Sequence, residues 1–213
     1  MIKIDLNTWN RKDTFLFFKN FDYPKFSITV DVDVTQFYQV IKEKKFSFYF
    51  SMIHLIMTEI NQFENFKYRI KGEDVYLYEK VHPSFTDLID HTEQFKIVNT
   101  EYLDDVSSFI IKAKEKSQAQ GSTFINLTDE IRQDLVYITT FPWAKFTQVT
   151  NAYHEPHKDS IPRLCFGKFE KINEKLMMPL SIEVHHGCMD GYHVGKFIEK
   201  LQKRLNTYTI PKI

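Results

Sequence analysis

Three kinds of residue that mark specialised proteins are scarce in this sequence of 213 residues, which contains 2 Cys, 6 Gly and 7 Pro. The two cysteines, Cys165 and Cys188, are too few for a disulfide framework and lack the spacing of a metal site. So few glycines and prolines argue against a loop-dominated or low-complexity chain. We therefore expect a packed globular protein with both thiols reduced.

The chain has no excess of charge of either sign, because 28 Lys and Arg residues balance 28 Asp and Glu residues. A protein that binds nucleic acid usually has an excess of basic residues or a stripe of them on its surface. The basic runs at 42–45 and 196–204 have acidic or apolar residues mixed in, which is typical of solvated helix faces. We expect no nucleic-acid partner.

Long apolar runs are also missing from the sequence. No stretch approaches the roughly 18 uncharged apolar residues of a membrane span. The first residues, MIKIDLNTWNRKDTF, carry charges throughout and leave no apolar stretch for a signal peptide. We expect no membrane partner and a cytoplasmic location.

Apolar and aromatic side chains, by contrast, are plentiful: 43% of residues are hydrophobic and 20 are Phe. This content is typical of a globular protein with a substantial core. Because domains usually run to about 100–200 residues, we expect residues 1–213 to form a single domain.

Apolar residues recur with the periods of both strands and helices. Strand patterns cover 26–34, 84–90, 94–102, 135–143, 163–172 and 174–186, and a hairpin is predicted over 68–81 with its turn at 72–74. Helical patterns cover 34–44, 46–63, 103–118 and the residues from Asp190 onward. Strands and helices mixed along the whole length predict an α/β fold, in which helices cover a sheet.

The stretch HHGCMDGYHVGKF, which runs from His185 to Phe197, carries the strongest chemical signal. Strand alternation continued past Val184 places His186 on the apolar face and His185 on the opposite one. An inward histidine beside a turn can act as a general base, because histidine titrates near neutral pH. Asp190 is well placed to cap the helix that follows.

Competing chemistries are weaker at the same residues. Adjacent histidines on a strand point to opposite sides, and Pro156 breaks any helix that would align His154 with His157, so we expect no metal site. Cys188 lies near His186, but a small thiol in a turn more often packs than attacks. The signatures G-x-S-x-G, G-x-x-x-x-G-K-[ST] and G-x-G-x-x-G do not occur.

The residues His185-His186-x-x-x-Asp190-Gly191 match the HHxxxDG signature of coenzyme A-dependent acyltransferases, which peptide-synthetase condensation domains and dihydrolipoamide acyltransferase cores share. Four further stretches narrow the resemblance, namely NTWNRKDTFLFF, YITTFPWAKF, FGKF and LMMPLSIEVHH. Together they make the whole chain similar to the chloramphenicol acetyltransferase family. The resemblance implies a two-layer sandwich, in which helices pack on a mixed β-sheet.

The resemblance also implies roles for individual residues. His186 would be the general base that takes a proton from an acceptor hydroxyl. Thr139 stands where the family has a serine that donates to the oxyanion, and threonine keeps that O–H donor. Asp190 and Arg11 would form an ion pair that holds the turn around His186.

The family's acceptor pocket and coenzyme site map onto further positions. The positions that match or replace the lining of the acceptor pocket are Phe17, Phe18, Phe26, Phe95, Val149, Asn151 and Cys165. At three of them the residue departs from the family pattern: Val149 and Asn151 replace larger apolar residues, and Cys165 replaces a threonine. The positions on the coenzyme A side are Trp143, Lys168 and Phe169.

The resemblance implies chloramphenicol and acetyl-CoA as substrates, no permanently bound cofactor, and a homotrimer with active sites at its interfaces. An acyltransferase of the same fold with a different hydroxylated acceptor remains open, because Val149, Asn151 and Cys165 differ from the family. A non-catalytic binding module is disfavoured by the intact set of His186, Asp190 and Arg11. A dihydrolipoamide acyltransferase core is disfavoured because no lipoyl domain precedes the fold.

Overall fold

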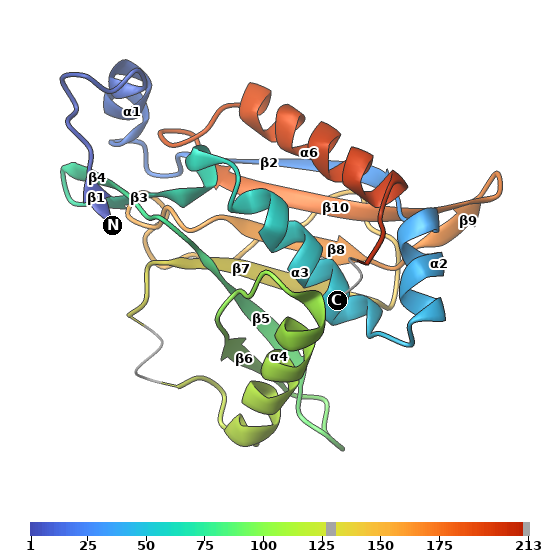
Figure 1. Cartoon of the computed structure of the whole chain (residues 1–213). Coiled ribbons are helices and arrows are strands. Elements are labelled where there is room, and N and C mark those ends of the chain that lie inside the picture. Colours follow the sequence, from blue (N-terminus) through green and yellow to red (C-terminus); the bar gives the residue numbers. More distant parts are fainter. Residues whose placement is uncertain (127–130, 211–213) are drawn as a thin grey trace.

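A computed structural model describes residues 1–126 and 131–210. Its centre is a mixed sheet of seven strands, with six in the order β2-β10-β8-β7-β5-β6 and β9 paired to β10 (Figure 1). The strands are β2 (Lys25–Asp33), β5 (His82–Leu88), β6 (Phe95–Asn99), β7 (Leu135–Phe141), β8 (Arg163–Gly167), β9 (Glu170–Ile172) and β10 (Lys175–His185). The pairs β5–β7 and β7–β8 are parallel and the others antiparallel, so the expected mixed sheet is confirmed.

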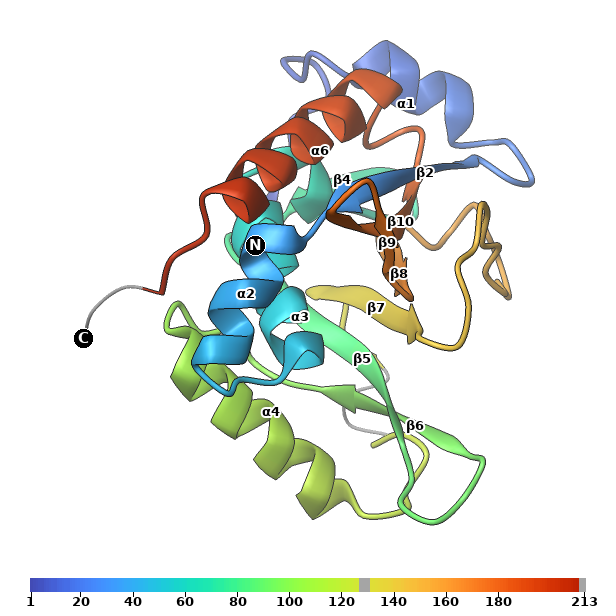
Figure 2. The ribbon, with the colours of Figure 1, turned by 90° about the vertical axis from the view of Figure 1, so that its right-hand side faces the viewer.

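Helices lie on one face of this sheet, as Figure 2 shows. They are α2 (Thr35–Glu43), α3 (Phe48–Ile60), α4 (Val106–Gln120) and α6 (Gly191–Asn206). The opposite face, which we call the open face, carries the side chains of Thr86, Thr139, Cys165, Ser181 and Glu183. The segment 142–162 folds over part of the open face, and there the Tyr153 hydroxyl donates to the Glu183 carboxylate.

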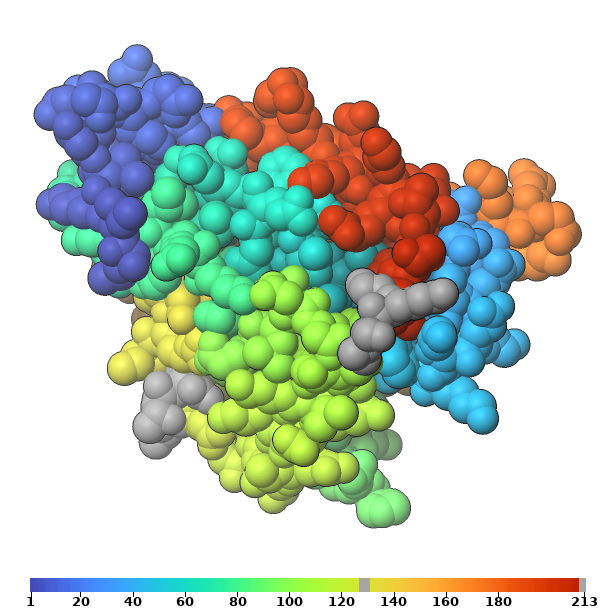
Figure 3. All heavy atoms as spheres, in the orientation of Figure 1, coloured from blue at the N-terminus to red at the C-terminus, as the bar shows by residue number. Residues whose placement is uncertain are grey.

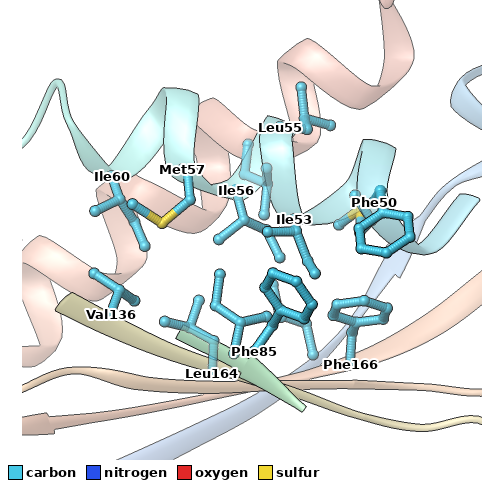
Figure 4. Packing of buried hydrophobic residues seen from close by; sticks show 14 of the residues in the cluster. Phe50, Ile53, Leu55, Ile56, Met57, Ile60, Phe85, Val136, Leu164 and Phe166 are labelled. Carbon is cyan, nitrogen blue, oxygen red and sulfur yellow. The ribbon is translucent and has the colours of Figure 1, made fainter. Parts of the chain in front are cut away.

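Helix α3 is the centre of the core between the sheet and the other helices (Figure 4). Its side chains are apolar almost all the way round, which is the pattern of a helix buried on every side. They pack on Phe85 from β5 and on Leu164 and Phe166 from β8, all of them at most 2% exposed. His54 lies in this helix and its Nε2 contacts the carbonyl oxygens of Leu103 and Asp104, as expected of a core histidine.

A second, smaller sheet packs beside the first and was only partly predicted. It contains β1 (Ile2–Lys3), β4 (Asp74–Leu77) and β3 (Tyr68–Lys71), and the predicted hairpin forms its last two strands. The short helix α1 (Lys12–Phe18) and the 3-10 helix η1 (Glu64–Lys67) were not predicted. Trp9, Phe15 and Cys188 share a small core with this sheet, so Cys188 serves packing.

The prediction of one strand over 163–172 is wrong in one respect, because the strand is interrupted after Gly167. A Cβ atom at Gly167 would lie 2.7 Å from the Phe146 ring and 2.8 Å from the Pro179 ring. This close approach requires glycine, and the pairing with β10 shifts by one residue between β8 and β9, from Phe166 opposite Leu180 to Glu170 opposite Met177. Asn173 and Glu174, with φ of 48° and 65°, form the tight turn between these two strands.

Two absences within the described residues bear on partners. Within residues 1–126 and 131–210, no helix is long and apolar enough to cross a membrane. The same ranges contain no group of three or more His, Cys, Asp and Glu side chains that could hold a metal ion.

Candidate active site

The turn after β10 places His186 at one end of the sheet. β10 ends at His185, whose carbonyl oxygen accepts hydrogen bonds from the amides of Cys188 and Met189 at 2.9 and 3.2 Å. The His186 amide donates to the Pro24 carbonyl oxygen at 2.8 Å, just before β2 begins. The backbone at His186 is therefore fixed from both sides by main-chain hydrogen bonds.

Two aromatic rings hold the imidazole of His186. It stacks on Phe18 with ring centroids 4.1 Å apart and an interplanar angle of 7°, and it lies 4.7 Å from Phe26. The His186 side chain remains 34% exposed. Its Nδ1 atom is buried and lies 3.3 Å from Asp190 Oδ1, without a hydrogen-bond partner among the described residues. Because Nδ1 is buried, Nε2 is the nitrogen that a substrate can reach.

The predicted ion pair between Arg11 and Asp190 is present and has the bidentate geometry that a guanidinium favours. Arg11 Nη1 donates to Asp190 Oδ2 at 2.6 Å, and Nη2 donates to Oδ1 at 2.9 Å and to the His186 carbonyl oxygen at 3.2 Å. The hydrogen bonds from Arg11 hold the pKa of the Asp190 carboxyl below its usual range. Figure 3 shows the N-terminal segment (blue) against the beginning of α6 (red).

His193 is a member of the site that the sequence analysis missed. Its Nδ1 accepts a hydrogen bond from the Asp190 amide at 3.1 Å, in the first turn of α6. Burial lowers the pKa of His193, and the nearby Arg11 lowers it further. The signal was available in the sequence, because His193 stands three residues after the predicted N-cap and can reach back to it.

The predicted alternation holds at the two histidines, but the burial expected from it does not. His186 lies on the helical face beside Phe26, as predicted, yet its side chain is 34% exposed, whereas His185, on the open face, is 1% exposed. The reason is that β10 is an interior strand and that the segment 142–162 lies against His185, where the backbone of His157 and the carboxylate of Asp159 interact with its imidazole. His185 Nδ1 accepts from the Gly187 amide at 3.0 Å, and burial lowers the pKa of His185 to about 3.

Thr139 lies in a separate pocket of about 550 Å³ on the open face. Its Oγ1 is 2.9 Å from Thr86 Oγ1. Two other predicted residues, Phe95 and Asn151, line the same pocket. Cys165 is paired with Thr139 across the strands, and burial raises the pKa of its thiol to about 11, so the thiol is neutral.

Within one chain, Thr139 and His186 are far apart. Thr139 pairs with Cys165 and Cys165 with Ser181, so His186 lies two strands across and five residues further along. At about 3.4 Å per residue and about 4.8 Å per strand, the separation is roughly 20 Å. Their side chains also leave opposite faces, since Phe26, which touches His186, packs with the helices.

Of the other predicted pocket residues, Phe17 lies near His186, whereas Val149 is not among the described residues that line the pocket of Thr139. Phe17 lies beside Phe18 at 5.0 Å and is 64% exposed, and Phe21 completes an aromatic group next to His186. Val149 is half-buried and belongs to the segment 142–162. The sequence analysis missed Phe21 and Thr86, both of which belong to these lining sets.

The predicted coenzyme A residues gather at the end of the sheet opposite His186. Trp143 follows β7 and Lys168 follows β8, and because these strands are parallel both side chains lie at one edge. Both are exposed. Phe169 is instead packed, with ring centroids 5.2 Å from Tyr38 and 5.4 Å from Phe48.

Comparison with solved structures defines the class of protein. A structure named chloramphenicol acetyltransferase matches with a TM-score of 0.87 and 27% identity, over 96% of this chain and 100% of that one. A probable dihydrolipoamide acetyltransferase from Listeria monocytogenes 4b F2365 matches with a TM-score of 0.68 over 100% of this chain and 97% of that one, and at 13% identity it shows the fold alone. The fold is that of an acyltransferase.

Sequence comparison then gives the family. A family model described as chloramphenicol acetyltransferase matches residues 1–202. Curated proteins named chloramphenicol acetyltransferase from Escherichia coli and Proteus mirabilis are 28% and 27% identical, covering 94% and 95% of this chain and 91% and 94% of theirs. The chain belongs to the chloramphenicol acetyltransferase family, whose members are acyltransferases.

Proposed function

We propose that this protein, as one acyltransferase domain, moves the acetyl group of acetyl-CoA to a hydroxyl group of chloramphenicol. The observation that carries the proposal is the imidazole of His186, clamped by Phe18 and Phe26 with one edge accessible. The Arg11–Asp190 ion pair also supports the position of His186, because the Arg11 guanidinium that binds Asp190 donates to the His186 carbonyl oxygen as well.

The proposed reaction is direct transfer with general-base catalysis. His186 Nε2 takes the proton of the acceptor hydroxyl while the oxygen attacks the thioester carbonyl carbon. The carbonyl oxygen becomes an oxyanion, and the Thr139 hydroxyl donates to it. When the intermediate collapses, the carbon–sulfur bond breaks and the thiolate takes the proton from the imidazolium, which restores neutral His186.

This reaction needs two chains. His186 and Thr139 lie roughly 20 Å apart in one chain by the strand spacings, which is too far for both to serve one carbonyl group. The pocket of about 550 Å³ around Thr139 lies on a face that no helix of the described residues covers. We infer that a neighbouring copy brings its pocket to His186, in a homotrimer with interface sites.

A different small hydroxylated acceptor is the second candidate. The pocket that holds Thr139 is also lined by the polar side chains of Asn151 and Arg163. Arg163 is held there by Asp159, at 2.7 Å, and by the ring of Tyr153, at 3.7 Å. This polar wall favours an acceptor with hydrogen-bonding groups at that end.

The test is release of free thiol from acetyl-CoA, measured with and without chloramphenicol. The first candidate predicts release that depends on chloramphenicol, and the second predicts release that depends on another hydroxylated compound. His186→Ala is expected to remove the release at least a thousandfold while the oligomer stays folded. Release by H186A at the unaltered rate would refute the general base.

A further inference from the structure

We infer that Thr86 is a positioning residue for the reaction, which aims the Thr139 hydroxyl at the reacting carbonyl oxygen. The inference rests on the proposed function, and in particular on Thr139 as the oxyanion donor. Its basis is the contact of 2.9 Å between Thr86 Oγ1 and Thr139 Oγ1, in which either hydroxyl can be the donor.

The direction of this hydrogen bond follows from the number of protons. A threonine hydroxyl has one proton and two lone pairs, so it donates once and accepts twice. If the Thr139 hydroxyl donates its proton to Thr86, it has no proton left to donate to an oxyanion. In the productive state Thr86 donates to Thr139, and Thr139 donates to the substrate. Each bond in such a chain polarises the next, which strengthens the donation.

The backbone places Thr86 for this task. β5 and β7 are adjacent parallel strands, with Phe85 paired to Ile138, so the next residue of each strand projects from the open face. The carbonyl oxygen of Thr86 accepts a hydrogen bond from the hydroxyl of Tyr49, which comes from the buried helix α3. Both threonines line the same pocket, where a substrate can reach Thr139.

Two other neighbours of Thr139 among the described residues do not offer the same hydrogen bond. Cys165, across the strand pair, carries a neutral thiol, which is a weak donor. Thr140 is next in sequence, but its hydroxyl donates to the Phe166 carbonyl oxygen at 3.0 Å. A β-branched side chain has few χ1 rotamers, so a single directed bond from Thr86 is enough to fix the Thr139 hydroxyl.

The experiment is a double-mutant cycle with Thr86→Val and Thr139→Ala in the full-length oligomer. The assay is thiol release from acetyl-CoA with chloramphenicol, or with water as the acceptor where chloramphenicol gives no turnover. T86V is expected to lower kcat about tenfold and to leave KM for acetyl-CoA within about twofold, since the lost bond acts on the transition state. T86S keeps the hydroxyl and is expected to restore kcat.

Thr140→Val is the matched control, because it removes a hydroxyl that bonds only main chain among the described residues. In the T139A background, T86V is expected to cause no further loss, since the two residues act as a unit. A kcat of T86V within about twofold of the unaltered protein, or an equal loss in both backgrounds, would overturn the inference. H186A in the same assay tests the proposed function separately.

Discussion

At the scale of single residues, the guanidinium of Arg11 binds two oxygens of Asp190 and one of His186. Lysine is a point charge and cannot reproduce this fork. Arg11→Lys is therefore expected to lower kcat about tenfold or more through a misplaced imidazole, with little change in KM. Steady-state kinetics of R11K beside Lys12→Arg, a charge-conserving control next to it, measure the difference. Equal kcat values for the two variants would contradict the positioning role.

The same pair gives a pH dependence of stability. Arg11 lowers the folded-state pKa of Asp190, so its stabilisation is present above the unfolded pKa and is lost as pH falls through the folded one. Because Asp190 is 36% exposed, solvent screens the pair, and we expect about 1 kcal/mol at neutral pH. Urea unfolding of D190N should show this deficit at pH 7 and a smaller one near pH 2. A deficit that does not vary with pH would contradict the linkage.

The burial of His185 predicts a second effect of pH on stability, over a different pH range. Its folded pKa of about 3 lies below that of an exposed histidine, so the unfolded chain binds the extra proton first. Stability should fall as pH drops from about 6.5 towards 3, with a slope of up to about 1.4 kcal/mol per pH unit from this residue. His185→Gln should reduce that slope in urea unfolding at pH 7, 6 and 5. An unchanged slope would show that His185 is not the group responsible.

The residues of the site were predictable to different degrees. His186, Asp190 and Arg11 followed from one motif and a short N-terminal stretch, because their local sequence is itself distinctive. Thr86 was out of reach, since a threonine in a strand has no local signal and its partner lies on a strand some 50 residues away. The burial of His185 was also out of reach, because it depends on a segment that folds over the open face.

At the scale of elements, the boundary between β8 and β9 depends on one glycine. Gly167→Ala would place a Cβ 2.7 Å from Phe146 and 2.8 Å from Pro179, so the segment 142–162 must shift. We expect a loss of about 1–3 kcal/mol in the free energy of unfolding, as for other overpacked sites. The matched control is Gly195→Ala in α6, where a Cβ would meet nothing within 4 Å. This substitution should raise the free energy of unfolding by up to about 1 kcal/mol, because alanine favours a helix more than glycine does. Urea unfolding of both variants measures the contrast, and equal effects would contradict the close-packing argument.

Periodicity predicted the long elements well, because a helix such as α6 or a strand such as β10 repeats its pattern over more than two turns or pleats. It failed for α1, which has 7 residues and is too short for a clear period. It also failed at Gly167, where the cause of the break is a contact with Phe146 and Pro179 rather than anything in the local sequence. Tertiary contacts thus set the boundaries that the pattern left undefined.

At the scale of the whole molecule, one sheet has different tasks on its two faces. The helical face forms the core and carries His186, the proposed base, beside Phe26, while the open face presents the pocket with Thr139. His186 and Thr139 lie roughly 20 Å apart in one chain by the strand spacings, so a monomeric variant is expected to be inactive even when folded. Size-exclusion chromatography with light scattering is expected to give a trimer for the unaltered chain, and an active monomer would contradict the shared site.

The most direct test of this shared site is complementation between two inactive chains. H186A and T139A chains are co-expressed with different tags, and oligomers that contain both are isolated and assayed for acetyl transfer. In mixed oligomers, some interfaces join the His186 of the T139A chain to the Thr139 of the H186A chain, so activity well above that of either parent is expected. Mixed oligomers no more active than the parents would show that both residues act within one chain, or not at all.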